Sequence, residues 1–165
     1  MILLDAAGFP QDMPFIMSVA AMPVIGGIGS VIMPKFMINM NVKAAYGDSS
    51  KVSDKLTQRY FDMTTRKGNR ESLITAFRVM KEQSQNPHLG DRVSEITIPT
   101  LLMWGGEDEW VPLSILKQFE EALANSQTIV YEGVGHMPME ELPVQTSRDA
   151  HNFFLMSAND KLPSI

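Results

Sequence analysis

Three short apolar runs along the chain predict β-strands. Residues 1–4 are apolar and end at a small, turn-forming stretch, residues 5–8. Residues 100–104 form a continuous apolar run that follows Pro99 and ends at two glycines, a pattern typical of a strand buried on both faces in a parallel sheet. Residues 128–131 are rich in β-branched and aromatic side chains, which favour a strand.

Apolar residues at helical spacing predict helices between and after these strands. The recurring sets are Leu56, Tyr60 and Met63; Leu73, Phe77 and Met80; and Leu113, Leu116, Phe119 and Leu123. Ser53 is the expected N-cap of the first of these helices and Asn69 of the second. Pro143 suits the first turn of a last helix, which we expect to end near Leu155.

The order of these elements predicts an α/β fold. Residues 92–156 should alternate strand, helix, strand and helix, and the right-handed crossover of such a unit makes the sheet parallel. Residues 9–91 are too long for a simple connection, so we predict that they pack as a helical lobe. The expected organisation is therefore a first strand within residues 1–8, the lobe at 9–91, the βαβα unit at 92–156 and a loose tail at 157–165.

The composition narrows the possible classes of function. A net charge of -5 and the lack of a long basic run argue against nucleic acid as a partner. The chain has no cysteine, which excludes disulfides and thiolate metal sites and fits the cytoplasm, where we expect the protein. The most apolar stretch, residues 14–40, is interrupted by prolines, glycines and Lys35, so we expect no membrane span. No basic segment precedes Asp5, so we predict no secretory signal.

Two loops at the expected carboxyl ends of strands contain residues suited to acid–base chemistry. Asp108 follows the strand at 100–104, and His136 follows the strand at 128–131. These residues are 28 positions and one βα unit apart, so we expect their loops to be neighbours at one edge of the sheet. A carboxylate that accepts a hydrogen bond from histidine fixes its tautomer and stabilises the imidazolium. Gly135 should let the chain turn tightly before His136.

The sequence around these two residues resembles the C-terminal part of the α/β-hydrolases. The pattern W-G-x-x-D-x-x-V-P occurs at residues 104–112, and G-H-M-P-M-E-E-L-P occurs at residues 135–143. The resemblance implies part of an α/β-hydrolase parallel sheet, of about three strands, with Asp108 as the acid and His136 as the general base of a catalytic triad. It also implies that the first strand corresponds to the sixth strand of that family. The lobe would then be a helical cap, and its stretches R-Y-F-D at residues 59–62 and G-N-R at residues 68–70 resemble the caps of esterase-like and carbon–carbon hydrolase-like members.

The nucleophile motif of that family, G-x-S-x-G, does not occur in these 165 residues. Ser30 and Ser49 come nearest, but neither has both glycines or the expected place between a core strand and helix. We therefore expect neither a nucleophile nor an oxyanion hole in this chain. Asp5, which follows the first strand, is an alternative acid. His88 and His151 lack spaced partners, so we expect no metal and no cofactor.

Three further side chains near the two loops are given structural interpretations. We interpret Trp104 and Trp110 as packing residues. Glu140 either braces the histidine loop or faces solvent, and the sequence leaves both alternatives open.

The leading hypothesis is that the chain is the C-terminal part of a serine-type hydrolase that cleaves an ester or a C–C bond in a small apolar carbonyl substrate. By itself the chain should be inactive, since it lacks the nucleophile. One alternative is a non-catalytic half-domain that forms oligomers or binds a ligand, and another is a separate chain that supplies the nucleophile. The unpaired edge of the first strand and the methionine-rich start of the lobe predict a homodimer or higher oligomer.

Overall fold

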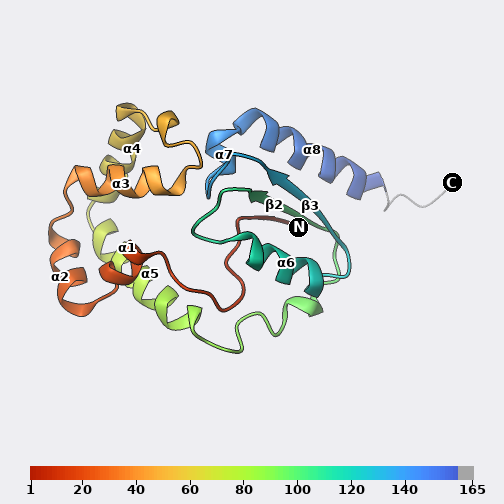
Figure 1. Ribbon diagram of the computed structural model, residues 1–165, viewed down its shortest axis with the longest axis horizontal. Coiled ribbons are helices and arrows are strands. Elements are labelled where there is room, and N and C mark those ends of the chain that lie inside the picture. Colours follow the sequence, from red (N-terminus) through yellow and green to blue (C-terminus); the bar gives the residue numbers. More distant parts are fainter. Residues whose placement is uncertain (160–165) are drawn as a thin grey trace.

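A computed structural model of the protein describes residues 1–159 and contains a three-stranded parallel sheet (Figure 1). The strands are β1 (Ile2–Leu4), β2 (Thr100–Gly105) and β3 (Ser126–Tyr131), and they lie side by side in that order. The predicted α/β class and the parallel sheet of about three strands are therefore confirmed. Strand β3 begins two residues before the β-branched run that predicted it.

Helices cover both faces of this sheet (Figure 1). Helix α6 (Leu113–Ala122) packs on one face, after the short 3-10 helix η2 (Val93–Glu95) and strand β2. Helix α8 (Pro143–Asn159) packs on the other face and directly follows the short helix α7 (Pro138–Glu141). Helix α8 extends four residues past its predicted end, and residues 160–165 of the predicted tail lie outside the described residues.

The centre of the fold is strand β2, which is buried on both faces. Leu102 and Trp104 belong to the cluster with helix α6, whereas Leu101 and Met103 belong to the cluster with helix α8. All four side chains are at most 2% exposed. Alternate residues of a strand point to opposite faces, so an uninterrupted apolar run is what a two-sided core requires.

We expect Trp104→Phe to lower the free energy of unfolding by about 2 kcal/mol, which a urea titration would measure. The indole Nε1 of Trp104 donates a buried hydrogen bond of 2.8 Å to the carbonyl oxygen of Val111. Phenylalanine cannot donate, so this carbonyl would lose its indole partner beside a small cavity. Trp110→Phe is the control, since Trp110 is only half-buried. An equal loss in both variants would contradict this account of Trp104.

The segment between β1 and β2 folds into helices that lie beside the sheet, and we call them the lobe (Figure 1). They are α1 (Phe15–Ala20), α2 (Pro23–Val31), α3 (Lys35–Ala45), the 3-10 helix η1 (Ser49–Lys51), α4 (Asp54–Thr65) and α5 (Asn69–Ser84). Part of the lobe has its own apolar cluster, formed by Ile38, Val42, Ala45, Tyr46 and Val52. The boundaries of the lobe as a separate unit, at residues 9 and 91, stay a prediction.

The structure confirms one of the two predicted helix N-caps in the lobe and contradicts the other. The Ser53 hydroxyl accepts a hydrogen bond of 3.1 Å from the amide of Leu56, so the N-cap of α4 is confirmed. The N-cap predicted at Asn69 is wrong, because α5 already includes this residue and its N-cap is Gly68, with a φ of 83°. The left-handed backbone favours glycine there, and the Asn69 side chain instead donates to the carbonyl oxygen of Met63.

The first part of the lobe exposes many large apolar side chains. Those more than 60% exposed within residues 15–36 are Phe15, Val24, Ile28, Val31, Ile32 and Phe36. Exposed apolar surface of this extent is typical of an interaction or ligand site. Across residues 1–159, no helix combines the length and the hydropathy needed to cross a bilayer.

Candidate active site

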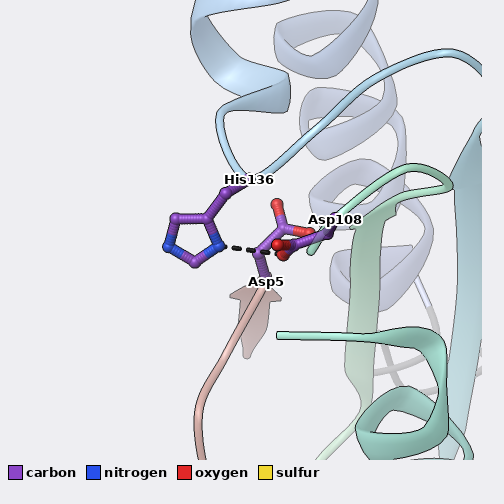
Figure 2. Close-up of side chains that lie close together, drawn as sticks. All are labelled: Asp5, Asp108 and His136. Carbon is purple, nitrogen blue, oxygen red and sulfur yellow. Dashed lines mark hydrogen bonds and ion pairs between the residues drawn. The ribbon is translucent and has the colours of Figure 1, made fainter. Parts of the chain in front are cut away.

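The ends of the three strands bring Asp5, Asp108 and His136 together (Figure 2). Asp5 directly follows β1, and Asp108 and His136 lie in the loops after β2 and β3. The strands are parallel, so their carboxyl ends meet at one edge of the sheet. The two residues predicted as acid and base therefore do lie in contact, and the alternative acid lies next to them.

Asp108 is held in place by the backbone of its own loop. Its Oδ1 accepts hydrogen bonds of 2.7 Å from the amide of Trp110 and 2.9 Å from the amide of Val111. The side chain is fully buried. Because both amides bond to Oδ1, the other oxygen, Oδ2, is directed at His136. Two amide donors stabilise the ionised form of a carboxylate, so Asp108 is well placed to act as a fixed hydrogen-bond acceptor.

His136 is oriented from three sides. Its Nδ1 lies 2.8 Å from Oδ2 of Asp108, and its backbone amide donates a hydrogen bond of 2.8 Å to the carbonyl oxygen of Ala45. The ring of Trp110 lies with its centroid 5.1 Å from the imidazole. The second ring nitrogen, Nε2, points away from both aspartates (Figure 2). An imidazole held at Nδ1 by a carboxylate and free at Nε2 has the arrangement that a general base needs.

Glycines let the backbone segments around His136 approach each other closely. A Cβ on Gly105 would overlap the carbonyl oxygen of Gly135, and a Cβ on Gly47 would lie 2.7 Å from the Gly135 amide nitrogen. Gly135 was predicted to supply a tight turn. Among the described residues the glycines with positive φ are Gly68, Gly90 and Gly133, so Gly135 has no left-handed backbone, and its tight turn stays a prediction. A Cβ there would lie 2.5 Å from the amide nitrogen of Gly47, so close backbone approach requires glycine.

A buried carboxylate, Glu141, joins the lobe to the histidine loop. Its Oε1 accepts hydrogen bonds from the amides of Gly47 and Gly135, at 3.0 and 2.8 Å. Its Oε2 accepts a bond of 3.3 Å from the amide of Asp48 and lies 3.6 Å from Nζ of Lys51. The sequence reasoning missed Glu141, because its donors at Gly47 and Asp48 are 94 and 93 positions away along the chain.

The neighbouring Glu140 binds the lobe directly, so it does not simply face solvent. It accepts hydrogen bonds from the hydroxyl groups of Tyr46, at 2.7 Å, and Tyr60, at 3.0 Å, and forms an ion pair with Arg59. Burial raises the pKa of both tyrosine hydroxyl groups, and their bonds to Glu140 add to the rise. Glu140 therefore helps to brace the histidine loop, through α4 and the end of α3.

Asp5 has an unusual environment for a carboxyl group. It is 4% exposed, its φ is 41°, and its Oδ1 accepts a hydrogen bond of 2.8 Å from the amide of Gly105. Its Oδ2 is buried and has no hydrogen-bond partner in the described part of the chain. Burial is the main cause that raises the pKa of this carboxyl group to about 7. The bond from Gly105 opposes the rise and the Asp108 carboxylate adds to it.

Asp5, Asp108 and His136 each offer one possible metal-ligating atom, and these atoms lie within 4.8 Å of one another. The hydrogen bond between Asp108 and His136 accounts for the approach of two of them. The absence of a metal therefore stays a prediction. His88 and His151 are exposed, and His88 pairs with Asp91 on the surface.

The two serines considered as substitute nucleophiles lie in the lobe. Ser49 begins η1 and is exposed, and Ser30 lies in α2. Among the described hydrogen bonds, none joins Ser49 to His136. The expectation that this chain lacks a nucleophile stays a prediction.

Comparison with known proteins gives partial matches to hydrolases. No family model matches the chain. It is 29% identical over 102 residues to the 2-hydroxy-6-oxononadienedioate/2-hydroxy-6-oxononatrienedioate hydrolase of Cupriavidus pinatubonensis, which covers 62% of this chain and 34% of that protein. It is 32% identical over 90 residues to a Pseudomonas putida hydrolase of the same name, numbered 1, which covers 54% of this chain and 31% of that protein. The chain thus spans about a third of these curated relatives.

Solved structures match nearly all of this chain. A variant of the meta-cleavage product hydrolase from Pseudomonas fluorescens has a TM-score of 0.77 and 23% identity, and the match covers 95% of this chain and 56% of that one. A thermophilic esterase from Thermogutta terrifontis has a TM-score of 0.72 and 18% identity, with 94% and 55% covered. The chain therefore has the α/β-hydrolase fold, as its sequence motifs implied, and spans about half of the solved members that it matches.

Proposed function

We propose that this chain is the C-terminal part of a serine-type α/β-hydrolase, with Asp108 as the acid and His136 as the general base of its triad. The observation that carries the proposal is the 2.8 Å hydrogen bond between Asp108 Oδ2 and His136 Nδ1 at the carboxyl ends of parallel strands. The nucleophile and the oxyanion hole belong to polypeptide that these 165 residues do not contain. The lobe is the cap over the completed site.

In this mechanism Asp108 accepts the Nδ1–H hydrogen bond and fixes the tautomer of the imidazole. His136 Nε2 takes the proton of a serine hydroxyl while the serine oxygen bonds to the substrate carbonyl carbon. The imidazolium, stabilised by Asp108, then gives that proton to the leaving group as its bond to carbon breaks. Water repeats the sequence and releases the acid product.

The substrate class follows from the relatives and from the lobe. The relatives named above are hydrolases of dienedioate and trienedioate compounds, and an esterase is among the structural matches. We propose a carbonyl substrate that is cleaved at an ester or C–C bond, with a small apolar part that contacts the lobe. A cytoplasmic location is proposed with it, since the chain has no cysteine.

The first test is the nucleotide sequence upstream of the Met1 codon. An open frame that encodes G-x-S-x-G is the expected result, and it would place the missing nucleophile in the same polypeptide. A stop codon close upstream, preceded by no other coding segment, would contradict this form of the proposal. Co-purification of a second chain that contains the motif would then show that two chains rebuild the site.

In the hydrolase completed in either way, we expect His136→Ala to lower ester turnover by about 10⁴-fold or more, because it removes the only proposed base. Turnover of a p-nitrophenyl ester is the measurement. His151→Ala is the matched control, because this histidine is exposed on α8 and should leave turnover unchanged. Ester turnover by the isolated 165-residue chain that depends on His136 would show that a nucleophile lies within it.

A non-catalytic, oligomeric half-domain is the second candidate, favoured by two observations. The lobe exposes apolar side chains within residues 15–36, and β1 pairs only with β2 in the described sheet. An apolar surface and a free strand edge both favour association with another chain. We expect light scattering of the isolated chain at micromolar concentration to give the mass of a dimer or larger species. A monomer would contradict this prediction.

A further inference from the structure

Asp5 is the one member of the cluster at the strand ends that the proposed mechanism does not use. It is as buried as Asp108, yet only its Oδ1 has a hydrogen-bond donor, the amide of Gly105. Its Oδ2 is without a partner in the described structure, although an ionised carboxylate needs donors at both oxygens. This oxygen therefore either bears a proton or is a strongly unfavourable buried charge.

The groups that face Asp5 decide between these two states. Asp108 approaches from the loop after β2, and His136 approaches from the loop after β3. Tyr131, at the end of β3, donates a hydrogen bond of 3.1 Å from its hydroxyl group to the carboxylate of Asp149 of α8, and burial raises its pKa, to which the charge of Asp5 adds. Among these groups, the imidazole of His136 is therefore the one source of positive charge for both buried carboxylates. Like charges at such a short separation disfavour ionisation of both, and one retained proton relieves the repulsion.

Asp108 is the member of the pair with the donors that an ionised carboxylate needs. Its two oxygens accept from the amides of Trp110 and Val111 and from Nδ1 of His136, so all of its contacts favour the charged form. Asp5 has one such donor and a left-handed backbone, a conformation that a non-glycine residue keeps only where its surroundings enforce it. The proton therefore belongs on Asp5.

We propose that Asp5 is a positioning residue that retains a proton in mildly acidic solution and donates it in a hydrogen bond to the carboxylate of Asp108, so that a carboxyl–carboxylate pair faces His136. The proposal rests on the proposed function only for the role of Asp108 as the acid. With the proton present, the pair has a single negative charge, which the imidazole Nδ1–H contacts through Asp108. Loss of the proton to solvent adds a second negative charge beside the ring and favours the imidazolium. The site thus has a built-in response to pH near neutrality, where burial places the pKa of Asp5.

Isotope-edited infrared spectroscopy of the whole chain tests the proton directly. With the aspartate carboxyl carbons labelled with ¹³C, we expect the C=O band of one protonated aspartate at about pH 6, well above the ordinary range for aspartate, and its loss as the pH is raised through about 7. Asp5→Asn should remove the band, whereas Asp12→Asn, an exposed control, should leave it. A spectrum with no protonated aspartate at about pH 6 would overturn the proposal without any variant.

Asparagine is a suitable probe at position 5 for three reasons. It tolerates the left-handed backbone, its Oδ1 can accept from Gly105, and its amide can donate to Asp108 where the proton is proposed. The infrared band of the protonated aspartate should therefore be absent from Asp5→Asn, while the NMR resonance of the His136 Nδ1–H proton should show that its bond to Asp108 is kept. Should that variant fail to fold, the carboxyl band of Asp5 in Asp108→Asn should disappear at a lower pH than in the natural chain, because the neighbouring negative charge is removed. An infrared carboxyl band that is unchanged in these variants would overturn the proposal.

These outcomes are distinguishable from failure of the proposed function. Turnover that survives His136→Ala in a completed hydrolase would refute the triad but leave the shared proton at Asp5 intact. A carboxyl group at Asp5 that titrates in the ordinary range would refute the shared proton but leave His136 and Asp108 as base and acid.

Discussion

Replacement of Glu141 by glutamine is expected to lower the free energy of unfolding by about 3 kcal/mol. The Glu141 side chain is fully buried and accepts hydrogen bonds from three backbone amides, those of Gly47, Asp48 and Gly135. Glutamine has the same shape, but its NH₂ group cannot accept, so at least one amide loses its partner. The hydrogen bonds to a charged acceptor that remain are also weakened. Urea unfolding measures the loss.

Hydrogen exchange of the amides that bond to Glu141 is a second measurement that tests this prediction. The amides of Gly47 and Gly135 should exchange with solvent faster in Glu141→Gln than in the natural chain. The amides of β2 should still rank in the same order by exchange rate. Glu140→Gln is the matched control, because that side chain is partly exposed and its partner Arg59 is half-exposed. We expect a loss of about 1 kcal/mol there. Equal losses in the two variants would mean that burial of Glu141 contributes nothing.

The strands were predictable because the apolar pattern of each strand is local in sequence, although their pairing is not. Strand β2 is apolar at every position between Thr100 and Gly105, and only a strand covered on both faces needs that pattern. The amphipathic spacing of α6 likewise follows from one buried face, with Ile115, Leu116 and Phe119 in the core. The start of α5 was placed wrongly because the left-handed turn at Gly68 depends on backbone geometry, which composition does not specify.

Topology predicted that the loops with Asp108 and His136 are neighbours, and the motif resemblance identified these two residues as the acid and the base. Parallel strands end at one edge, and the two loops follow adjacent strands, so the sequence separation translates directly into proximity. Glu141 was not predictable in this way, because its donors come from residues 47–48, which are 93 or more positions away, and from Gly135. The unpaired oxygen of Asp5 escaped prediction for a related reason: only the folded chain shows which donors are missing.

The lobe and the acid–base pair are physically one unit, and this bears on how a completed site would work. The His136 amide bonds to Ala45 at the end of α3, and the two glutamates after the histidine bond to residues 46–60 of the lobe. A movement of this part of the lobe would therefore displace the imidazole unless these bonds broke. We infer that α3 and α4 stay fixed to the histidine loop. Helices α1 and α2, by contrast, have few buried apolar residues and expose several.

Replacement of Gly105 by alanine is expected to lower the free energy of unfolding by at least about 3 kcal/mol, or to prevent folding. A Cβ at this position would overlap the carbonyl oxygens of Val134 and Gly135, which are backbone atoms and cannot rotate away. The histidine loop would have to move off the end of β2. Because the Gly105 amide also bonds to Asp5, the same shift would disturb all three residues of the cluster.

Gly27→Ala is the matched comparison, since this residue is inside helix α2 and, apart from its chain neighbours and the backbone of its own helix, no described atom lies within 4 Å of the added methyl group. Alanine favours a helix over glycine, so this variant should gain about 1 kcal/mol in stability. Thermal unfolding measures both changes, and the NMR resonance of the His136 Nδ1–H proton reports whether the bond to Asp108 survives. A Gly105→Ala chain that is as stable as the natural one and keeps this resonance would refute the tight approach of the two loops. A loss of stability in Gly105→Ala together with loss of this resonance would show that the acid and the base are held together by backbone contact as well as by their own hydrogen bond.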